Sequence, residues 1–430
     1  MAPFTSYPLE TPALRHLEII PTEHEGQPLL LVRDPLGLME GEMAALYPDP
    51  LLLVFFQYAN GKTTLKQMAV KATHATGHII TEDQMLQIAK QLDDALMLLS
   101  PKFEEAWDRQ KEDYASLTAR KPTVFRSEDR LLLLKQLGDE FRRHKMSAKS
   151  PPAKLDLAPN SLRAILAPHI DYMRGGEAYA WAYKAVAEHS QATTFVILGT
   201  LHRPCGHPFI ATRKAYETPL GTAEVDREAL DFLENKFGGE LYDEEYLHAQ
   251  EHTIELQVVY LQHVLQNRPF KIVPILVGSF EELLMVDPPM QPTDVPEIAQ
   301  FIEALKATMA HLGKRGLLIG GVDFSHCGPE FGDEVKNTPQ REEEVRERDT
   351  VMLKHIDTLD AKGFFDFFRG DFNETKVCSI APIYCLLQAL APDTEGKTLI
   401  YSQSNDPQRD CMVTFAGVAF TAKAPKIILT

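Results

Sequence analysis

Apolar runs of strand length alternate with amphipathic segments along residues 161–430, and this alternation constrains the fold more than any other feature. The strand candidates are 164–167, 194–198, 272–277, 316–319 and 413–420. Apolar residues at helical spacing fill the intervals at 176–189, 226–237, 252–265, 295–312, 342–359 and 381–390. Strands that alternate with helices are typical of α/β domains. We therefore expect an α/β domain over 161–430 with a largely parallel sheet.

The first part of the chain has a different pattern and predicts a separate small module over 1–100. Its candidates are a strand at 29–32 and helices at 50–58, 63–76 and 82–99. This combination suggests a winged-helix-like α+β unit with an interaction or scaffold role. Residues 101–160 read as a helical connector and an extended linker that contains Pro151 and Pro152. We place the domain boundary near residue 150.

Charge and cysteine content exclude several classes of protein. The net charge of -17 disfavours nucleic-acid and anionic-membrane partners. The amino terminus lacks the basic and apolar regions of a signal peptide, and the apolar run 51–56 is far too short to cross a membrane. Five cysteines without a Cys-x-x-Cys pair do not form a disulfide framework. These features predict a cytoplasmic protein.

Histidine-bearing sequence follows three of the strand candidates. His169 comes after 164–167, His202 after 194–198, and Asp323 and His326 after 316–319. In parallel sheets the carboxyl ends of the strands share one edge, where ligands bind. Cys378 precedes the helix candidate at 381–390 and could join them from a loop. A single histidine of this kind is most often structural, so the prediction of a site depends on the repetition.

Imidazole, carboxylate and thiolate together form a set of donors suited to a transition metal. Imidazole suits iron, copper, zinc and nickel, and thiolate favours softer metals. An oxygen-handling iron site, a hydrolytic zinc site and metal-free thiol chemistry all remain open on the residues alone. His252 and Glu255 share a helix face, where His252 could act as a base. Tyr172 and Ser325 are candidates for supporting the ligands.

The same motifs carry a resemblance to a known family. They occur in the order Ala167–Tyr172, Leu198–His202, Glu251–Glu255, Pro274–Gly278, Val322–His326 and Cys378–Pro382. Together they resemble the Memo family, whose bacterial and archaeal members are called AmmeMemoRadiSam system protein B. The family is similar in fold to class III extradiol dioxygenases, which implies a central mixed sheet with helices on both faces.

The resemblance also implies functional residues and partners. It implies that His169, His202 and Cys378 bind iron or copper, and that His252, Asp323 and His326 line the same pocket as catalytic groups. It further implies radical-SAM and AMMECR1-like protein partners. The module at 1–100 is similar in pattern to PqqD-like peptide-recognition domains.

Three functions follow as hypotheses. The first is a metal-dependent redox enzyme or oxygenase that uses the six residues above. The second is a binding or scaffold protein that presents a peptide or partner through its amino-terminal module. The third is a zinc-dependent hydrolase that uses the same pocket, which the cysteine disfavours.

Overall fold

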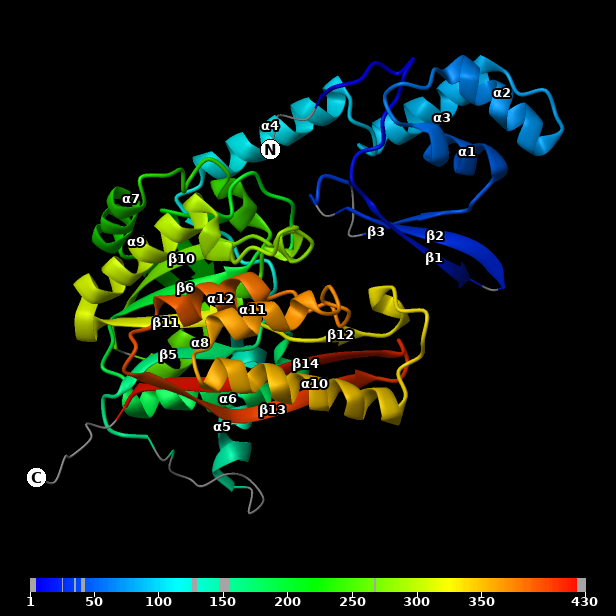
Figure 1. The fold of residues 1–430 in the computed structure, drawn as a ribbon. Helices are drawn as coiled ribbons and strands as arrows, with labels where there is room; N and C mark the ends of the chain where they lie inside the picture. Colours follow the sequence, from blue (N-terminus) through cyan, green and yellow to red (C-terminus); the bar gives the residue numbers. More distant parts are fainter. Residues whose placement is uncertain are drawn as a thin grey trace, which may run out of the picture. The chain divides into compact units, whose positions relative to one another are not determined.

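The chain folds into two compact units, residues 1–117 and 118–430 (Figure 1). The computed structural model describes residues 5–24, 26–34, 36–39, 43–125, 130–146, 155, 157–266 and 268–423. Residues expected to form a helical connector are divided between the units. The helix at 101–116 belongs to the first unit and the helix at 130–146 to the second. Pro151 and Pro152 of the expected linker lie outside the described residues.

The described residues of the first unit form a three-stranded antiparallel sheet and four helices. Its elements are β1 (Glu18–His24), β2 (Gln27–Arg33), β3 (Met43–Leu46), α1 (Pro50–Tyr58), α2 (Leu65–Thr76), α3 (Glu82–Asp94) and α4 (Pro101–Ser116). Thr64 and Thr81 begin α2 and α3 with capping boxes, in which a glutamine side chain returns a hydrogen bond to the cap backbone. Phe55, Met68 and Met85 are fully buried in a core that belongs to this unit. The small α+β module expected from the sequence is therefore present.

The second unit is built on a mixed sheet. Its four central strands, β5 (Leu162–Ala167), β11 (Gly316–Gly321), β6 (Thr194–Thr200) and β10 (Lys271–Val277), lie side by side in that order and are parallel. The flanking strands are β4 (Ala119–Arg120), β7 (Phe209–Ala211), β8 (Ala215–Thr218), β9 (Gly221–Val225), β12 (His326–Cys327), β13 (Thr394–Asp406) and β14 (Cys411–Ala422). β14 pairs antiparallel with β5, so the sheet is mixed, as the fold class predicted.

Helices cover both faces of this sheet (Figure 1). One layer packs on β5, β14 and β6 and consists of α5 (Arg130–Met146), α6 (Tyr172–His189) and α8 (Thr253–Leu265). The other layer contains α7 (Arg227–Phe237), α9 (Pro296–Leu312), α10 (Pro339–Asp357), α11 (Ala361–Arg369) and α12 (Ile380–Ala389). Among the described residues, no helix is both long enough and apolar enough to cross a membrane.

A cluster of tyrosines joins α6 to α8. Tyr172, Tyr179 and Tyr183 recur at helical spacing on one face of α6 and pack around Tyr260 of α8, with ring centroids 4.9 to 5.1 Å apart. The Tyr172 hydroxyl donates to the Leu256 carbonyl at 2.6 Å. The rings bury apolar area, and the satisfied hydroxyl avoids the cost of a buried unpaired group. The contact fixes α8 relative to the strand end that carries His169.

Candidate metal centre

The parallel core brings three separate chain segments to one edge of the sheet. His169, His202 and Asp323 each stand two residues beyond the end of β5, β6 and β11, which are adjacent and parallel. Cys378 reaches the same edge from the turn before α12. The ligand atoms of His169, His202 and Cys378 all lie within 4.8 Å of one another. Residues 33 to 209 positions apart thus form one cluster.

Hydrogen bonds fix the orientation of the His169 ring. Its Nδ1 lies 3.0 Å from the Gly321 carbonyl oxygen, which can only accept, so Nδ1 carries the proton. The unprotonated Nε2 then faces the Cys378 Sγ at 3.4 Å. The backbone amide of His169 donates to Asp323 at 2.9 Å. Only 3% of His169 is exposed, so it lies at the base of the site.

Glu251 orients the other two histidines. Its buried carboxylate lies 3.2 Å from Nδ1 of His202 and 3.1 Å from Nδ1 of His252, and it accepts the backbone amides of both residues. It also accepts the amide of Thr253, so it binds the amino end of α8, where a negative charge is favourable. With each Nδ1 directed at Glu251, each Nε2 is left for a ligand. Through these bonds Glu251 can orient both rings, and its carboxylate also forms a second group of possible donor atoms with His202 and His252.

The three imidazoles form one group. The ring centroid of His169 is 5.0 Å from that of His202 and 5.8 Å from that of His252, and both contacts are edge-on. The rings of His202 and His252 are stacked 5.3 Å apart. Their side chains are 38% and 40% exposed, whereas His169 is buried. The centre therefore opens to solvent on the side of His202 and His252.

Asp323 and His326 complete the set of predicted site residues. Asp323 Oδ2 lies 3.6 Å from His169 Nε2, next to the position that a metal ligated by this nitrogen would take. Burial raises the pKa of Asp323 despite the neighbouring His326. His326 Nδ1 lies 2.9 Å from the Phe324 carbonyl oxygen, so its Nε2 is unprotonated when the ring is neutral. Burial lowers the pKa of His326, which favours the neutral ring.

The charges of the site favour a thiolate. Burial alone would raise the pKa of Cys378, but the charges and hydrogen bonds of His169 and His202 lower it to about 6. Burial would likewise lower the pKa of His202, yet the Glu251 carboxylate and Cys378 hold it well above its usual range. A thiolate beside imidazole nitrogens is the form in which cysteine binds metal ions.

Close packing of α8 against the strand ends depends on a glycine. A Cβ atom at Gly199 would lie 2.5 Å from Thr253 Oγ1 and 2.6 Å from Ile254 Cγ1. The Thr253 hydroxyl donates to the Thr200 carbonyl at 3.0 Å. The first turn of α8, which follows Glu251 and His252, therefore rests directly on the end of β6.

Three residues considered with the site make their hydrogen bonds to other parts of the second unit. Glu255 does not share the site with His252; it pairs with Arg120, and both side chains are fully buried. The Tyr172 hydroxyl binds α8, and Ser325 donates to Asp349 at 2.8 Å, so neither contacts the donor atoms directly. Glu251 was missed because its contact with His202 spans 49 positions, which no helical spacing reveals.

The sequence is similar to proteins of one known family. The family model described as Memo-like protein matches residues 135–419. A MEMO1 family protein of Aquifex aeolicus is 24% identical, covering 91% of this chain and 95% of its own length. A MEMO1 family protein of Methanosarcina acetivorans is 30% identical over 60% of this chain and 84% of its own. Residues 118–430 alone make up less than 91% of the chain, so the Aquifex match includes part of the first unit.

Proposed function

This chain belongs to the Memo family, and from that premise we propose that it is a metal-dependent redox enzyme or oxygenase. His169, His202 and Cys378 hold the metal ion. The observation that carries the proposal is the convergence of two imidazole nitrogens and a thiol within 4.8 Å, with Nδ1 of each ring directed at an oxygen acceptor. Iron or copper fits this set because thiolate is a soft ligand and imidazole suits both metals.

The donor set fits a metal with free coordination positions. Three protein donors leave room for substrate or water, as catalytic sites do and closed structural sites do not. When bound, the metal supplies a redox-active or Lewis-acidic centre. Glu251 accepts from Nδ1 of His202, so the proton that a metal ion displaces is the one on Nε2, and the Gly321 carbonyl orients His169 with Nε2 unprotonated.

Three neighbouring side chains handle protons in this proposal. His252 stands at the open side with Nδ1 held by Glu251, so its Nε2 can take a proton from a bound substrate. Asp323 lies beside His169 Nε2 and can hold a proton, because burial favours its neutral form. The His326 ring has its Nδ1 held by backbone carbonyls, which leaves Nε2 as a further acceptor. The first unit, with its own core, is the part we assign to contacts with a peptide or partner protein.

Elemental analysis of protein purified without oxygen tests the proposal. Wild-type protein should contain about one equivalent of iron or copper per chain, and His169→Ala and Cys378→Ser should each lose most of it. His207→Ala and Cys205→Ser are matched controls because neither residue belongs to the cluster, and both should retain the metal. Unchanged metal content in both ligand variants would overturn the assignment.

Metal analysis also distinguishes the redox enzyme from a zinc-dependent hydrolase and from a binding or scaffold protein. Zinc in place of iron or copper, together with hydrolytic activity that depends on it, would favour the hydrolase. Wild-type protein that takes up no metal even when iron, copper and zinc are supplied would favour a binding or scaffold protein.

A further inference from the structure

A second cavity lies at the opposite edge of the same sheet, remote from the metal donors. It has a volume of about 1170 Å³ and is lined by the first residues of β5 and β11, Leu162 and Gly316. The ends of α6 and α12, at His189 and Ala389, also line it. Ligand cavities of 300–1,000 Å³ are typical of proteins, so this space is large enough for a small organic molecule.

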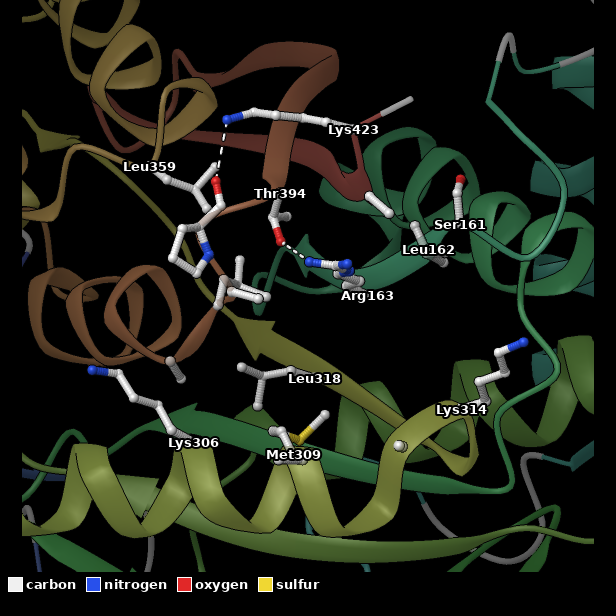
Figure 2. Close-up of a pocket in the computed structure, with 18 of the residues that line it drawn as sticks. Ser161, Leu162, Arg163, Lys306, Met309, Lys314, Leu318, Leu359, Thr394 and Lys423 are labelled. Atoms are coloured by element: carbon white, nitrogen blue, oxygen red, sulfur yellow. Dashed lines mark hydrogen bonds between the residues drawn. The ribbon is translucent and has the colours of Figure 1, made fainter. Parts of the chain in front are cut away.

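The walls of the cavity are mainly apolar. Met309 of α9 and Leu318 of β11 point into it in Figure 2, and Leu359 borders it on another side. Leu387 and Leu390 of the α12 end add to this surface. Apolar walls of this kind favour a ligand with a hydrocarbon or aromatic body.

The charged residues of the lining are all basic, although the chain carries a net charge of -17. They are Arg163, Lys306, Lys314 and Lys423, and no described aspartate or glutamate belongs to the lining. Figure 2 shows them on different sides of the space. Within the described part of the chain, Arg163 pairs with Asp393, and Lys306 with Glu303.

Two of these cations have no carboxylate partner among the described residues. Lys423 donates to the Pro392 carbonyl at 3.2 Å and has the Asp393 carboxylate, which already pairs with Arg163, as a neighbouring charge. Lys314 follows α9 on the other side of the cavity. The carboxyl end of α9 carries a partial negative charge that offsets part of the charge of Lys314. An anionic group on a ligand would compensate what remains.

His189 provides an independent indication of a polar ligand. It is 9% exposed, and neither ring nitrogen has a hydrogen-bond partner among the residues that the structure describes. Nε2 lies 4.0 Å from Glu188 Oε2, which is beyond hydrogen-bond distance. A buried polar group without a partner is unfavourable, and a hydrogen bond from a ligand would satisfy it.

We infer that this cavity is a binding site for an amphipathic organic anion, a molecule with an apolar body and a carboxylate or phosphate head group. The apolar body lies against Met309, Leu318 and Leu359. The anionic head group pairs with Lys314 or Lys423 at the rim, and a polar atom of the ligand bonds to His189. This site is independent of the proposed metal centre, because none of the metal donors lines it.

Calorimetric titration of the full chain tests the inference with four probes: octyl phosphate, octanoate, inorganic phosphate and octanol. We expect one molecule of octyl phosphate or octanoate to bind per chain, and the tighter of the two identifies the head group. Inorganic phosphate and octanol should each bind at least tenfold more weakly, because each lacks half of the recognised chemistry.

Three variants locate the binding. Lys314→Glu/Lys423→Glu should weaken anion binding at least tenfold, whereas Lys236→Glu/Lys354→Glu, which changes the charge equally outside the cavity, should not. Met309→Trp should narrow the cavity beside Leu318 and weaken binding of the apolar body. His189→Phe should weaken binding without lowering the melting temperature, because the ring nitrogens make no hydrogen bond within the described part of the chain. Metal content should stay at the wild-type level throughout.

Three results of these titrations would overturn the inference. Absence of saturable binding by both anions would overturn it, and so would binding that the lysine and tryptophan variants leave unchanged. Octanol that binds as tightly as the anions would also overturn it, because the lysines would then have no role. The lysine variant changes only exposed side chains, so it remains informative even if Met309→Trp fails to fold.

Discussion

Glu251 is the residue on which the geometry of the candidate centre depends most. Its carboxylate lies within hydrogen-bond distance of Nδ1 of His202 and His252 and accepts the backbone amides at the start of α8. A carboxylate in this position fixes ring orientation and increases the basicity of a metal-binding imidazole. Burial would raise the pKa of Glu251, but His202 and His252 hold it well below its usual range, so it stays ionised.

Substituting this carboxylate by an amide tests the role. Glu251→Gln keeps the shape but offers a donor to rings that need an acceptor, so we expect metal affinity to fall about 10- to 100-fold. Competition with a chelator of known affinity measures the change. Glu244→Gln is the matched control, because Glu244 also accepts two backbone amides but lies outside the cluster. Equal affinities for the two variants would contradict the role.

His248 makes stability depend on pH. The Tyr216 hydroxyl lies 2.7 Å from its Nδ1, and its Nε2 lies 2.9 Å from the Ile210 carbonyl oxygen, so the buried ring is neutral. Burial lowers the pKa of His248 to about 3. The unfolded chain binds this proton near pH 6.5 and the folded chain does not. The stabilisation is therefore complete above pH 6.5 and is lost progressively as the pH falls toward 3.

We expect His248→Gln to reduce this pH dependence. Between pH 7.5 and 5.5 the variant should lose about 1 kcal/mol less unfolding free energy than wild type, because it has no proton to gain there. Urea unfolding followed by Trp181 fluorescence measures the second unit. A Trp107→Phe background removes the only other tryptophan. Identical pH dependence in variant and wild type would show that His248 is not a buried neutral ring.

At the scale of elements, the first turn of α8 must approach the end of β6 closely. Gly199→Ala introduces a Cβ that meets Thr253 and Ile254, so the helix has to shift. We expect a loss of about 1–3 kcal/mol in unfolding free energy and weaker metal binding, because Glu251 and His252 move with the turn. Gly370→Ala is the control: its φ is -66° and nothing lies within 4 Å of the added carbon. If Gly199→Ala were as stable as Gly370→Ala, close approach of α8 to β6 would not contribute to stability.

The strands that the sequence predicts are long and buried, whereas those that it misses are short or only partly buried. β5, β6 and β11 were predicted because buried parallel strands are continuous apolar runs, and the residues after them identified the shared edge. β7 and β8 have three and four residues, too few for a periodic signal. β13 is 13 residues long but only partly buried, so its sequence lacks an apolar run.

At the scale of the whole molecule, residues just after the first unit are part of the candidate centre's support. Arg120 is fully buried and donates to the carbonyls of His248 at 3.0 Å and Glu251 at 2.7 Å. It also pairs with Glu255, which accepts the amides of Thr123 at 2.9 Å and of its neighbour Val124 at 3.2 Å. The sequence placed these residues in a connector because a pair 135 positions apart leaves no local pattern.

Removing Arg120 while keeping Glu255 should strongly destabilise the second unit. Arg120→Met leaves Glu255 as a buried charge without its cation, which costs about 3–5 kcal/mol of unfolding free energy. Urea unfolding in the Trp107→Phe background should report this loss in the second unit. Metal affinity should fall as well, because Arg120 no longer holds the carbonyls on either side of the turn that leads into α8.

A second substitution separates the charge from the contact. Arg120→Met/Glu255→Gln removes the unpaired charge, and the glutamine oxygen can still accept the amides of Val124 and Phe125, which bond to Oε1 of the carboxylate. We expect about half of the lost stability to return, whereas metal affinity should stay low because the Glu251 carbonyl still lacks its donor. Recovery of both quantities together would show that Arg120 acts on the centre only by neutralising Glu255. Recovery of neither would show that the hydrogen bonds to the 248–251 backbone, and not the charge, account for its contribution.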